Sequence, residues 1–309
     1  DIGIIKLTPD GTKRVYATYL GGSGNEMPQS LIVDNAGQLI IAGRTDSPNS
    51  GAGAFPANTQ IGPGGSWDIF ITKLNAQGSG IVGSIRIGGS SNDGANITPC
   101  GSSGATSLQR NYGDEARSEV NLDAAGNIYL ASCTQSDNFP VKNGFQTTKG
   151  SLQDGVILKF NPSLSTLLFS SYLGGSGPSS NTGNDAAYVV EVNPVTNDIY
   201  VAGGTESTNL PGNTAGTIGP SNNGSVDGFI SIISNDGSAI KQTTYLGTGA
   251  IDQVYGLKFD QLGFPYVMGQ TTGTWPIRNA AWSTPNGRQF IAKLKPDLSA
   301  FVYSTVFGK

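Results

Sequence analysis

The stretch TYLGGSG, at residues 18–24, returns as SYLGGSG at 171–177 and in a weaker form as TYLGTG at 244–249. Two further copies have changed more, RIGGSS from Arg86 and VFGK from Val306. The copies are spaced by about 60 to 90 residues, the range in which solenoid and propeller repeats are found. The repeat therefore has to be understood before any single element.

Each interval between these copies holds the same two signals in the same order. The first is an apolar run interrupted by a turn, at 31–43, 120–132, 190–203 and 257–269. Asp34, Asp123 and Asp260 each stand three residues before a glycine in this run, which is the chemistry of a tight hairpin turn. The second is an alternating apolar run broken by Pro, Asn, Asp or Gly, at 68–82, 154–168, 227–240 and 289–302.

These signals predict four strands per repeat, which we name A to D, with A–B and C–D hairpins. Four-stranded antiparallel units repeating at this length are typical of β-propeller blades, so we expect an all-β propeller. The Tyr of YLGG then lies on strand D, and we expect it to pack between sheets.

The predicted boundaries make the chain a single propeller of about four and a half blades. A half blade with strands C and D only covers 1–22, and complete blades cover 23–89, 90–175, 176–248 and 249–309, with an insertion at 92–115. Because a ring normally closes by completing every blade, we expect further chain, or a partner molecule, to supply the missing A–B hairpin.

The same residues resemble a known family. YLGGSG, the VDNAG and IIAG of 33–43, the Phe-Pro pairs at 55–56 and 139–140, and DIFITKLN at 68–75 are similar to the SBBP repeat, named for a seven-bladed β-propeller. This resemblance implies a secreted or surface-anchored bacterial protein, in which the repeat acts as a scaffold and carries no catalytic motif. It implies an adhesion or binding role at an extracellular location.

Composition narrows the function further. Charged residues make up 13% of the 309 residues, the net charge is −4, and no run of Lys or Arg occurs, so nucleic acid is a poor candidate partner. No apolar run is long enough for a transmembrane helix. The chain has no histidine, which excludes Ser-His-Asp and Cys-His nucleophile systems.

Up-and-down connectivity places the B–C and D–A links at one end of the sheets, and these links hold every long segment. We expect protein or glycan binding at this long-loop face. The candidate contacts are Trp67, Asn92, Asp93, Asp114, Asn184, Asp185 and Asp252. Trp275, which precedes Pro276, is instead expected to be a buried anchor.

Several alternatives remain open at this stage. A carbohydrate-active enzyme could use a pair of carboxylates on the long-loop face, and Asp93, Asp114, Glu115, Asp185 and Asp252 all fall there. No cofactor is expected, although the Asn- and Asp-containing loops at 90–96 and 181–187 could hold calcium. Cys100 and Cys133 could form a disulfide or remain buried thiols.

Overall fold

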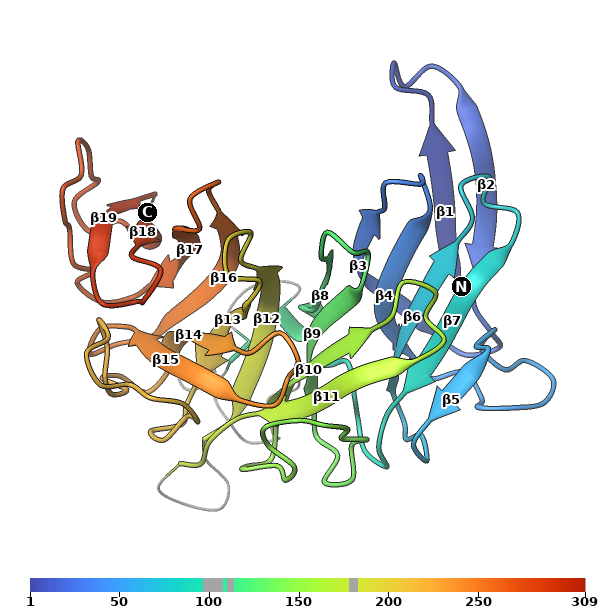
Figure 1. Cartoon of the computed structure of the whole chain (residues 1–309), viewed down its shortest axis with the longest axis horizontal. Coiled ribbons are helices and arrows are strands. Elements are labelled where there is room, and N and C mark those ends of the chain that lie inside the picture. The colour runs from blue at the N-terminus through green and yellow to red at the C-terminus, as the bar shows by residue number, and fades with distance from the viewer. Residues whose placement is uncertain (97–107, 110–113, 178–182, 309) are drawn as a thin grey trace.

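The computed structural model describes residues 1–96, 108–109, 114–177 and 183–308, and within them the chain is all-β apart from one short 3-10 helix, η1 (Asp114–Ala116). The strands form five separate sheets that follow one another along an arc (Figure 1). No helix among these residues is long and apolar enough to cross a membrane.

The half sheet, at the blue end of Figure 1, holds β1 (Ile2–Leu7) and β2 (Arg14–Leu20). The first sheet holds β3 (Glu26–Val33), β4 (Leu39–Thr45), β6 (Asp68–Leu74), β7 (Ile81–Ile87) and the short β5 (Thr59–Ile61). The second holds β8 (Glu119–Leu122), β9 (Ile128–Thr134), β10 (Asp154–Phe160) and β11 (Leu167–Leu173).

The third sheet holds β12 (Asp185–Val192), β13 (Ile199–Thr205), β14 (Asp227–Ile233) and β15 (Ile240–Leu246). The fourth holds β16 (Asp252–Phe259), β17 (Pro265–Thr271), β18 (Gln289–Leu294) and β19 (Phe301–Phe307). In these two sheets and in the second, neighbouring strands pair antiparallel in sequence order, as predicted.

The predicted hairpin turns are confirmed. Asp34 Oδ1 accepts hydrogen bonds from the backbone N–H groups of Ala36 and Gln38, both at 2.9 Å, and Gly37 has a φ of 76°. Asp123 and Asp260 make the same two bonds, with Gly126 and Gly263 at positive φ. A short acidic side chain thus caps the turn while glycine supplies the left-handed backbone.

Adjacent sheets bury their cores against each other, and the first strand of each sheet packs on the preceding sheet. Tyr172 and Tyr245 are buried as expected, and the Tyr172 hydroxyl donates to the Ser136 carbonyl oxygen at 2.8 Å. Tyr19, in the half sheet, is 81% exposed instead, because no described sheet covers that face.

The long B–C links differ from the expectation of loops displayed at one end. Each link turns back and runs along the outer edge of its own last strand. In the first sheet this run forms β5, parallel to β7, so that sheet has five strands where four were predicted. Lys142, Asn213 and Arg278 bridge to β11, β15 and β19 in the same way.

An apolar side chain anchors the start of each returning link. Phe55 packs on Phe70 with ring centroids 4.8 Å apart, and Trp275 stacks on Phe290 at 3.7 Å. The prediction that Trp275 is a buried anchor is therefore confirmed. The links protect the outer strands from edge-to-edge pairing, which is a known hazard for exposed sheet edges.

Candidate functional site at the loop end of the sheets

In the first, third and fourth sheets, the first residue of the first strand carries a buried carboxylate. In the second sheet Asp93, which lies before the first strand, supplies this carboxylate. Asp185 Oδ1 accepts from the Thr205 hydroxyl at 2.5 Å, while its Oδ2 accepts from the Ser207 hydroxyl and the Gly175 N–H, both at 2.8 Å. These contacts join the end of one sheet to the start of the next. We call this arrangement the carboxylate latch.

The latch recurs at Asp93 and Glu26. Asp93 accepts from Thr134, from Ser136 at 3.0 Å and from the Gly89 N–H at 2.8 Å. Glu26 accepts from Thr45 at 2.7 Å and from Ser47 at 2.5 Å. The spacing Thr-x-Ser at the end of strand B therefore serves the carboxylate of strand A in three sheets.

The second glycine of YLGG is required by this latch. A Cβ at Gly89 would lie 2.3 Å from Ser136 Cβ, and one at Gly175 would lie 2.8 Å from Ser207 Cβ. Only a residue without a side chain lets the hydroxyl approach the strand.

The fourth sheet makes the same latch with the partners exchanged. Thr248 replaces the second glycine, and Gly273 replaces the Ser of Thr-x-Ser. The Thr248 hydroxyl donates to Asp252 Oδ2 at 2.8 Å, and a Cβ at Gly273 would lie 2.0 Å from Thr248 Oγ1. The Asp252 carboxylate therefore still accepts a hydrogen bond from a hydroxyl group, which Thr248 supplies in place of the serine found in the other sheets.

The first glycine of YLGG leaves room for a second carboxylate, which lies at the start of strand C. A Cβ at Gly88 would lie 1.9 Å from Asp68 Oδ1, and Gly174 and Gly247 stand in the same relation to Asp154 and Asp227, each with its nearest carboxylate atom at 2.2 to 2.3 Å. Each junction between sheets therefore brings two carboxylates close to one glycine pair.

The first of these junctions contains its own counter-ion. Arg86, which stands where other repeats have Tyr, donates from Nε to Asp68 Oδ2 at 2.7 Å and from Nη1 to the Ser47 carbonyl oxygen. The second contact replaces the one that Tyr172 makes with Ser136. Desolvation raises the pKa of Asp68, and the Arg86 guanidinium opposes that rise.

The other carboxylates have only hydrogen bonds or distant charges to oppose their burial. Desolvation raises the pKa of Asp93 to about 7 and that of Asp227 to about 7, and Asp252 contributes repulsion at Asp227. It also raises the pKa of Asp154 to about 6, and that of Asp185 well above its usual value. Burial of the charged form dominates at each position.

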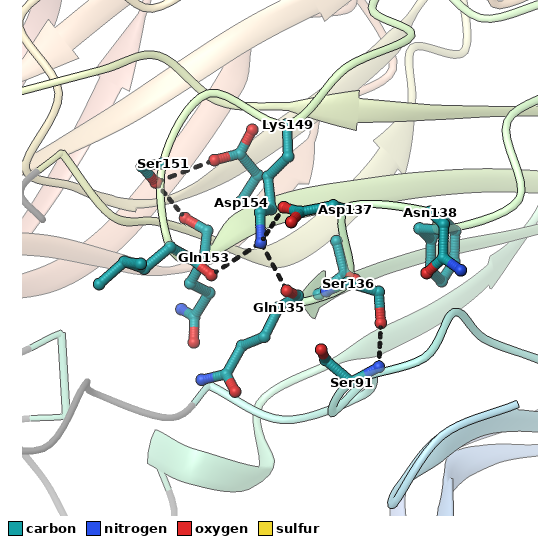
Figure 2. Close-up of polar contacts among 12 residues, drawn as sticks. Ser91, Gln135, Ser136, Asp137, Asn138, Lys149, Ser151, Gln153 and Asp154 are labelled. Carbon is teal, nitrogen blue, oxygen red and sulfur yellow. Dashed lines mark hydrogen bonds and ion pairs between the residues drawn. The ribbon is translucent and has the colours of Figure 1, made fainter. Parts of the chain in front are cut away.

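The returning link of the second sheet is fixed around Lys149 (Figure 2). Its ammonium group lies 2.8 Å from Asp137 Oδ1 and donates to the carbonyl oxygens of Gln135 and Leu152. Figure 2 also shows the Ser151 hydroxyl donating to Asp154, at 3.1 Å. The link and the strand C carboxylate therefore form one polar network.

The described residues of the insertion lie against the inner strands of the third and fourth sheets. The Leu108 carbonyl oxygen accepts from the Tyr188 hydroxyl and from Gln253 Nε2, both at 2.9 Å. Asn96 Nδ2 donates to the Tyr188 hydroxyl at 3.1 Å, and Asp114 accepts from Arg117 at 2.6 Å. The insertion thus connects the second sheet to two others.

Most of the seven predicted contact residues are committed to internal bonds. Asp93, Asp114, Asp185 and Asp252 are fully buried, and 4% of Asn184 is exposed. Asn92 Nδ2 donates to Gln135 at 3.3 Å. Their role as ligand contacts stays a prediction, and the bonds that hold them were not predicted.

Trp67 is half-buried at this end of the first sheet. The Arg44 guanidinium lies 4.8 Å from its ring centroid, and its carbonyl oxygen accepts from the Asp93 N–H at 2.8 Å. Its ring therefore already has a cationic partner.

Cys100 lies outside the described residues, so a disulfide between Cys100 and Cys133 stays a prediction. Cys133 is fully buried in β9, and burial raises the pKa of its thiol to about 12. Of the proposed calcium loops, 181–182 also lies outside the described residues. Within them, no group of three or more His, Cys, Asp or Glu side chains could hold a metal ion.

An open groove of about 470 Å³ lies between the third and fourth sheets. Its lining includes Thr217, Gly219, Asn223, Trp275, Arg278 and Phe301. These residues come from three distant links and strands, so no local motif could have revealed it. It offers backbone polar groups, hydroxyls, an amide, a guanidinium and aromatic edges in one concave surface.

No family model and no curated protein matches the chain. Among solved structures, one resembling it is a protein of unknown function from Dyadobacter fermentans, with 13% identity over 94% of this chain and 71% of that chain, at a TM-score of 0.48. Another is the NanB sialidase from Streptococcus pneumoniae, with 7% identity over 95% and 53%, at 0.46. A third is a polysaccharide lyase described as an ulvan lyase, with 14% identity over 89% and 54%, at 0.41.

The chain spans about half the length of the sialidase and of the lyase. Identities this low, with TM-scores below 0.5, carry no information about the activity of this chain.

Proposed function

We propose that this chain is a non-catalytic β-propeller scaffold of about four and a half blades, secreted or held at a bacterial cell surface, that binds a glycan. The observation that carries the proposal is the repeated carboxylate latch. It commits Asp93, Asp185 and Asp252 to joining consecutive sheets, so they hold the scaffold together. The SBBP resemblance supports the same role and is the basis for the location.

The groove between the third and fourth sheets is the best candidate for the binding surface. Glycans are bound by hydrogen bonds to their hydroxyls and by apolar contact with the flat faces of their rings. Asn223 and Arg278 supply exposed donors and acceptors, while the half-buried Phe301 supplies apolar surface. Because the rim of the groove rests on latched sheets, it is held in place before the ligand arrives.

A glycan array probed with the purified protein tests the proposal. We expect retention of a defined set of oligosaccharides, weakened about tenfold or more by Arg278→Ala, which corresponds to one lost charge-assisted contact. Arg14→Ala, at an exposed position on the half sheet, is the matched control and should leave binding unchanged. Absence of any retained glycan, or equal loss in both variants, would contradict the proposal.

One observation favours the second candidate, a carbohydrate-active enzyme using loop carboxylates. Burial raises the pKa of Asp93 to about 7, the range that a general acid needs near neutral pH, but its side chain is fully buried behind three internal hydrogen bonds. Asn substitution of Asp93, Asp114, Glu115, Asp185 and Asp252, one at a time, separates the two candidates. If these residues only form the latch, the Asn variants melt at a lower temperature and no turnover is seen even in the wild type. If the chain is an enzyme, turnover is lost at one or two of these positions.

A further inference from the structure

The junction between the third and fourth sheets holds two buried carboxylates side by side. Val226 and Ile251 form a parallel bridge, and the Asp252 N–H donates to the Val226 carbonyl oxygen at 2.9 Å. Asp227 and Asp252, the next residue on each side of this bridge, are both fully buried. The negative charge of Asp252 acts on Asp227. The two side chains therefore form a pair between two sheets of four strands each.

In the first two junctions, the burial of such carboxylates is compensated. Every carboxylate oxygen there accepts a hydrogen bond, which holds for Asp68, Asp93, Asp154 and Asp185. Each of the two junctions also contains a cation. Arg86 contacts Asp68 at 2.7 Å, and the positive charge of Lys149 acts on Asp154. Hydrogen bonds and a positive charge together offset the cost of removing these groups from water.

The third junction lacks both kinds of compensation. Asp227 Oδ2 accepts from the Asn223 N–H and Asp252 Oδ2 from the Thr248 hydroxyl, each at 2.8 Å. The Oδ1 atoms of both carboxylates are buried without a hydrogen-bond partner. The nearby Thr271 hydroxyl lowers the pKa of Asp252, but it forms no hydrogen bond with Oδ1. In the part of the chain that the structure describes, no Lys or Arg lies within ion-pair distance of either carboxylate.

Glycines and a carbonyl oxygen surround the unpartnered Asp227 Oδ1. This atom and the Ala250 carbonyl oxygen lie 3.0 and 2.0 Å from the point where a Gly224 Cβ would be. A Cβ at Gly247 would lie 2.2 Å from the same Oδ1. Gly247 and Asn223 also line the groove of about 470 Å³ described above. The groove therefore reaches the residues that enclose the pair.

We propose that Asp227 and Asp252 bind a calcium ion between the third and fourth sheets, with their Oδ1 atoms as ligands. A divalent cation balances the charge of two adjacent carboxylates, whereas a monovalent cation leaves one charge buried. Calcium binds carboxylate and carbonyl oxygens in flexible geometry, while magnesium demands an octahedral shell and loses water reluctantly. The Ala250 carbonyl oxygen is a further ligand within this small space. The ion takes the role that Arg86 has in the first junction. This inference does not depend on glycan binding.

Isothermal titration calorimetry with CaCl2 at about pH 8 tests the proposal on the full 309-residue chain, after treatment with EGTA and removal of the chelator. We expect saturable binding of a single ion, weakened about tenfold or more by Asp227→Asn and by Asp252→Asn, because each removes a charged ligand. Asp154→Asn, at the position of Asp227 in the second sheet, is the matched control and should bind calcium as the wild type does. Absence of saturable binding, or equal weakening in the control, overturns the proposal.

Thermal melting of Asp227→Asn separates an ion site from a purely structural role. In EGTA this variant should melt at a higher temperature than the wild type, because it removes one of two repelling buried charges. In millimolar CaCl2 the order should reverse, since only the wild type is stabilised by the bound ion. A wild type that melts at the same temperature in calcium and in EGTA contradicts the proposal, and the pair would then be neutralised by a shared proton.

Discussion

The exchanged latch of the fourth sheet predicts a strong coupling between Thr248 and Gly273. Gly273→Ser alone forces a Cβ into contact with Thr248, whose Oγ1 would lie 2.0 Å away, and overpacking of this kind costs about 1–3 kcal/mol. Thr248→Gly alone removes the 2.8 Å hydrogen bond to the buried Asp252 carboxylate, which costs about 1–3 kcal/mol. The double variant restores the Gly and Ser arrangement of the other sheets, so both losses should largely disappear.

Urea unfolding followed by tryptophan fluorescence measures the effect. If the singles were independent, the double variant would lose about 2–6 kcal/mol, whereas we expect it within about 1 kcal/mol of the wild type. Gly249→Ser, at the next glycine along, meets no atom within 4 Å and is the neutral control. Additive losses in the double variant would refute the idea that the two positions exchange one hydroxyl.

Two further predictions concern the buried charges. Arg86→Leu leaves Asp68 buried without its counter-ion, and we expect a loss of about 3–5 kcal/mol in the same unfolding assay; an unchanged midpoint would show that the ion pair does not stabilise the first junction. The raised pKa values of Asp93, Asp154 and Asp227 mean that the folded chain binds more protons than the unfolded chain between about pH 4 and 7. The stability that these groups contribute should therefore be greatest at about pH 4 and fall continuously as the pH rises to about 7, and thermal melting across this range checks the sign.

The all-β repeat could be predicted because its signals are local. The turn aspartates Asp34, Asp123 and Asp260 and the glycines that follow them act within five residues, and the structure uses them as expected. The course of the B–C links could not be predicted in this way. A link such as 272–288 has no alternation of its own, and its path is set by Trp275 packing on Phe290 and by pairing with β19.

The burial of the carboxylates in the candidate site was not predicted from the sequence for a related reason. Asp93, Asp185 and Asp252 read as polar loop residues beside Asn and Gly, which is also how exposed ligand contacts read. Their burial depends on hydroxyls about 20 to 40 residues away on strand B, at Thr134 and Thr205 among others. Comparing the repeats could have found the link, because Thr-x-Ser closes strand B wherever the second glycine of YLGG is present.

The two repeated motifs of the chain, YLGG and Thr-x-Ser, therefore act together at the junctions between sheets. The glycines leave space for the carboxylates and hydroxyls of the junctions. The long links cover the outer edges of the sheets, most fully where β5 pairs with β7. Under the scaffold proposal, binding uses a surface that these links leave open, and the groove beside Trp275 and Arg278 is such a surface.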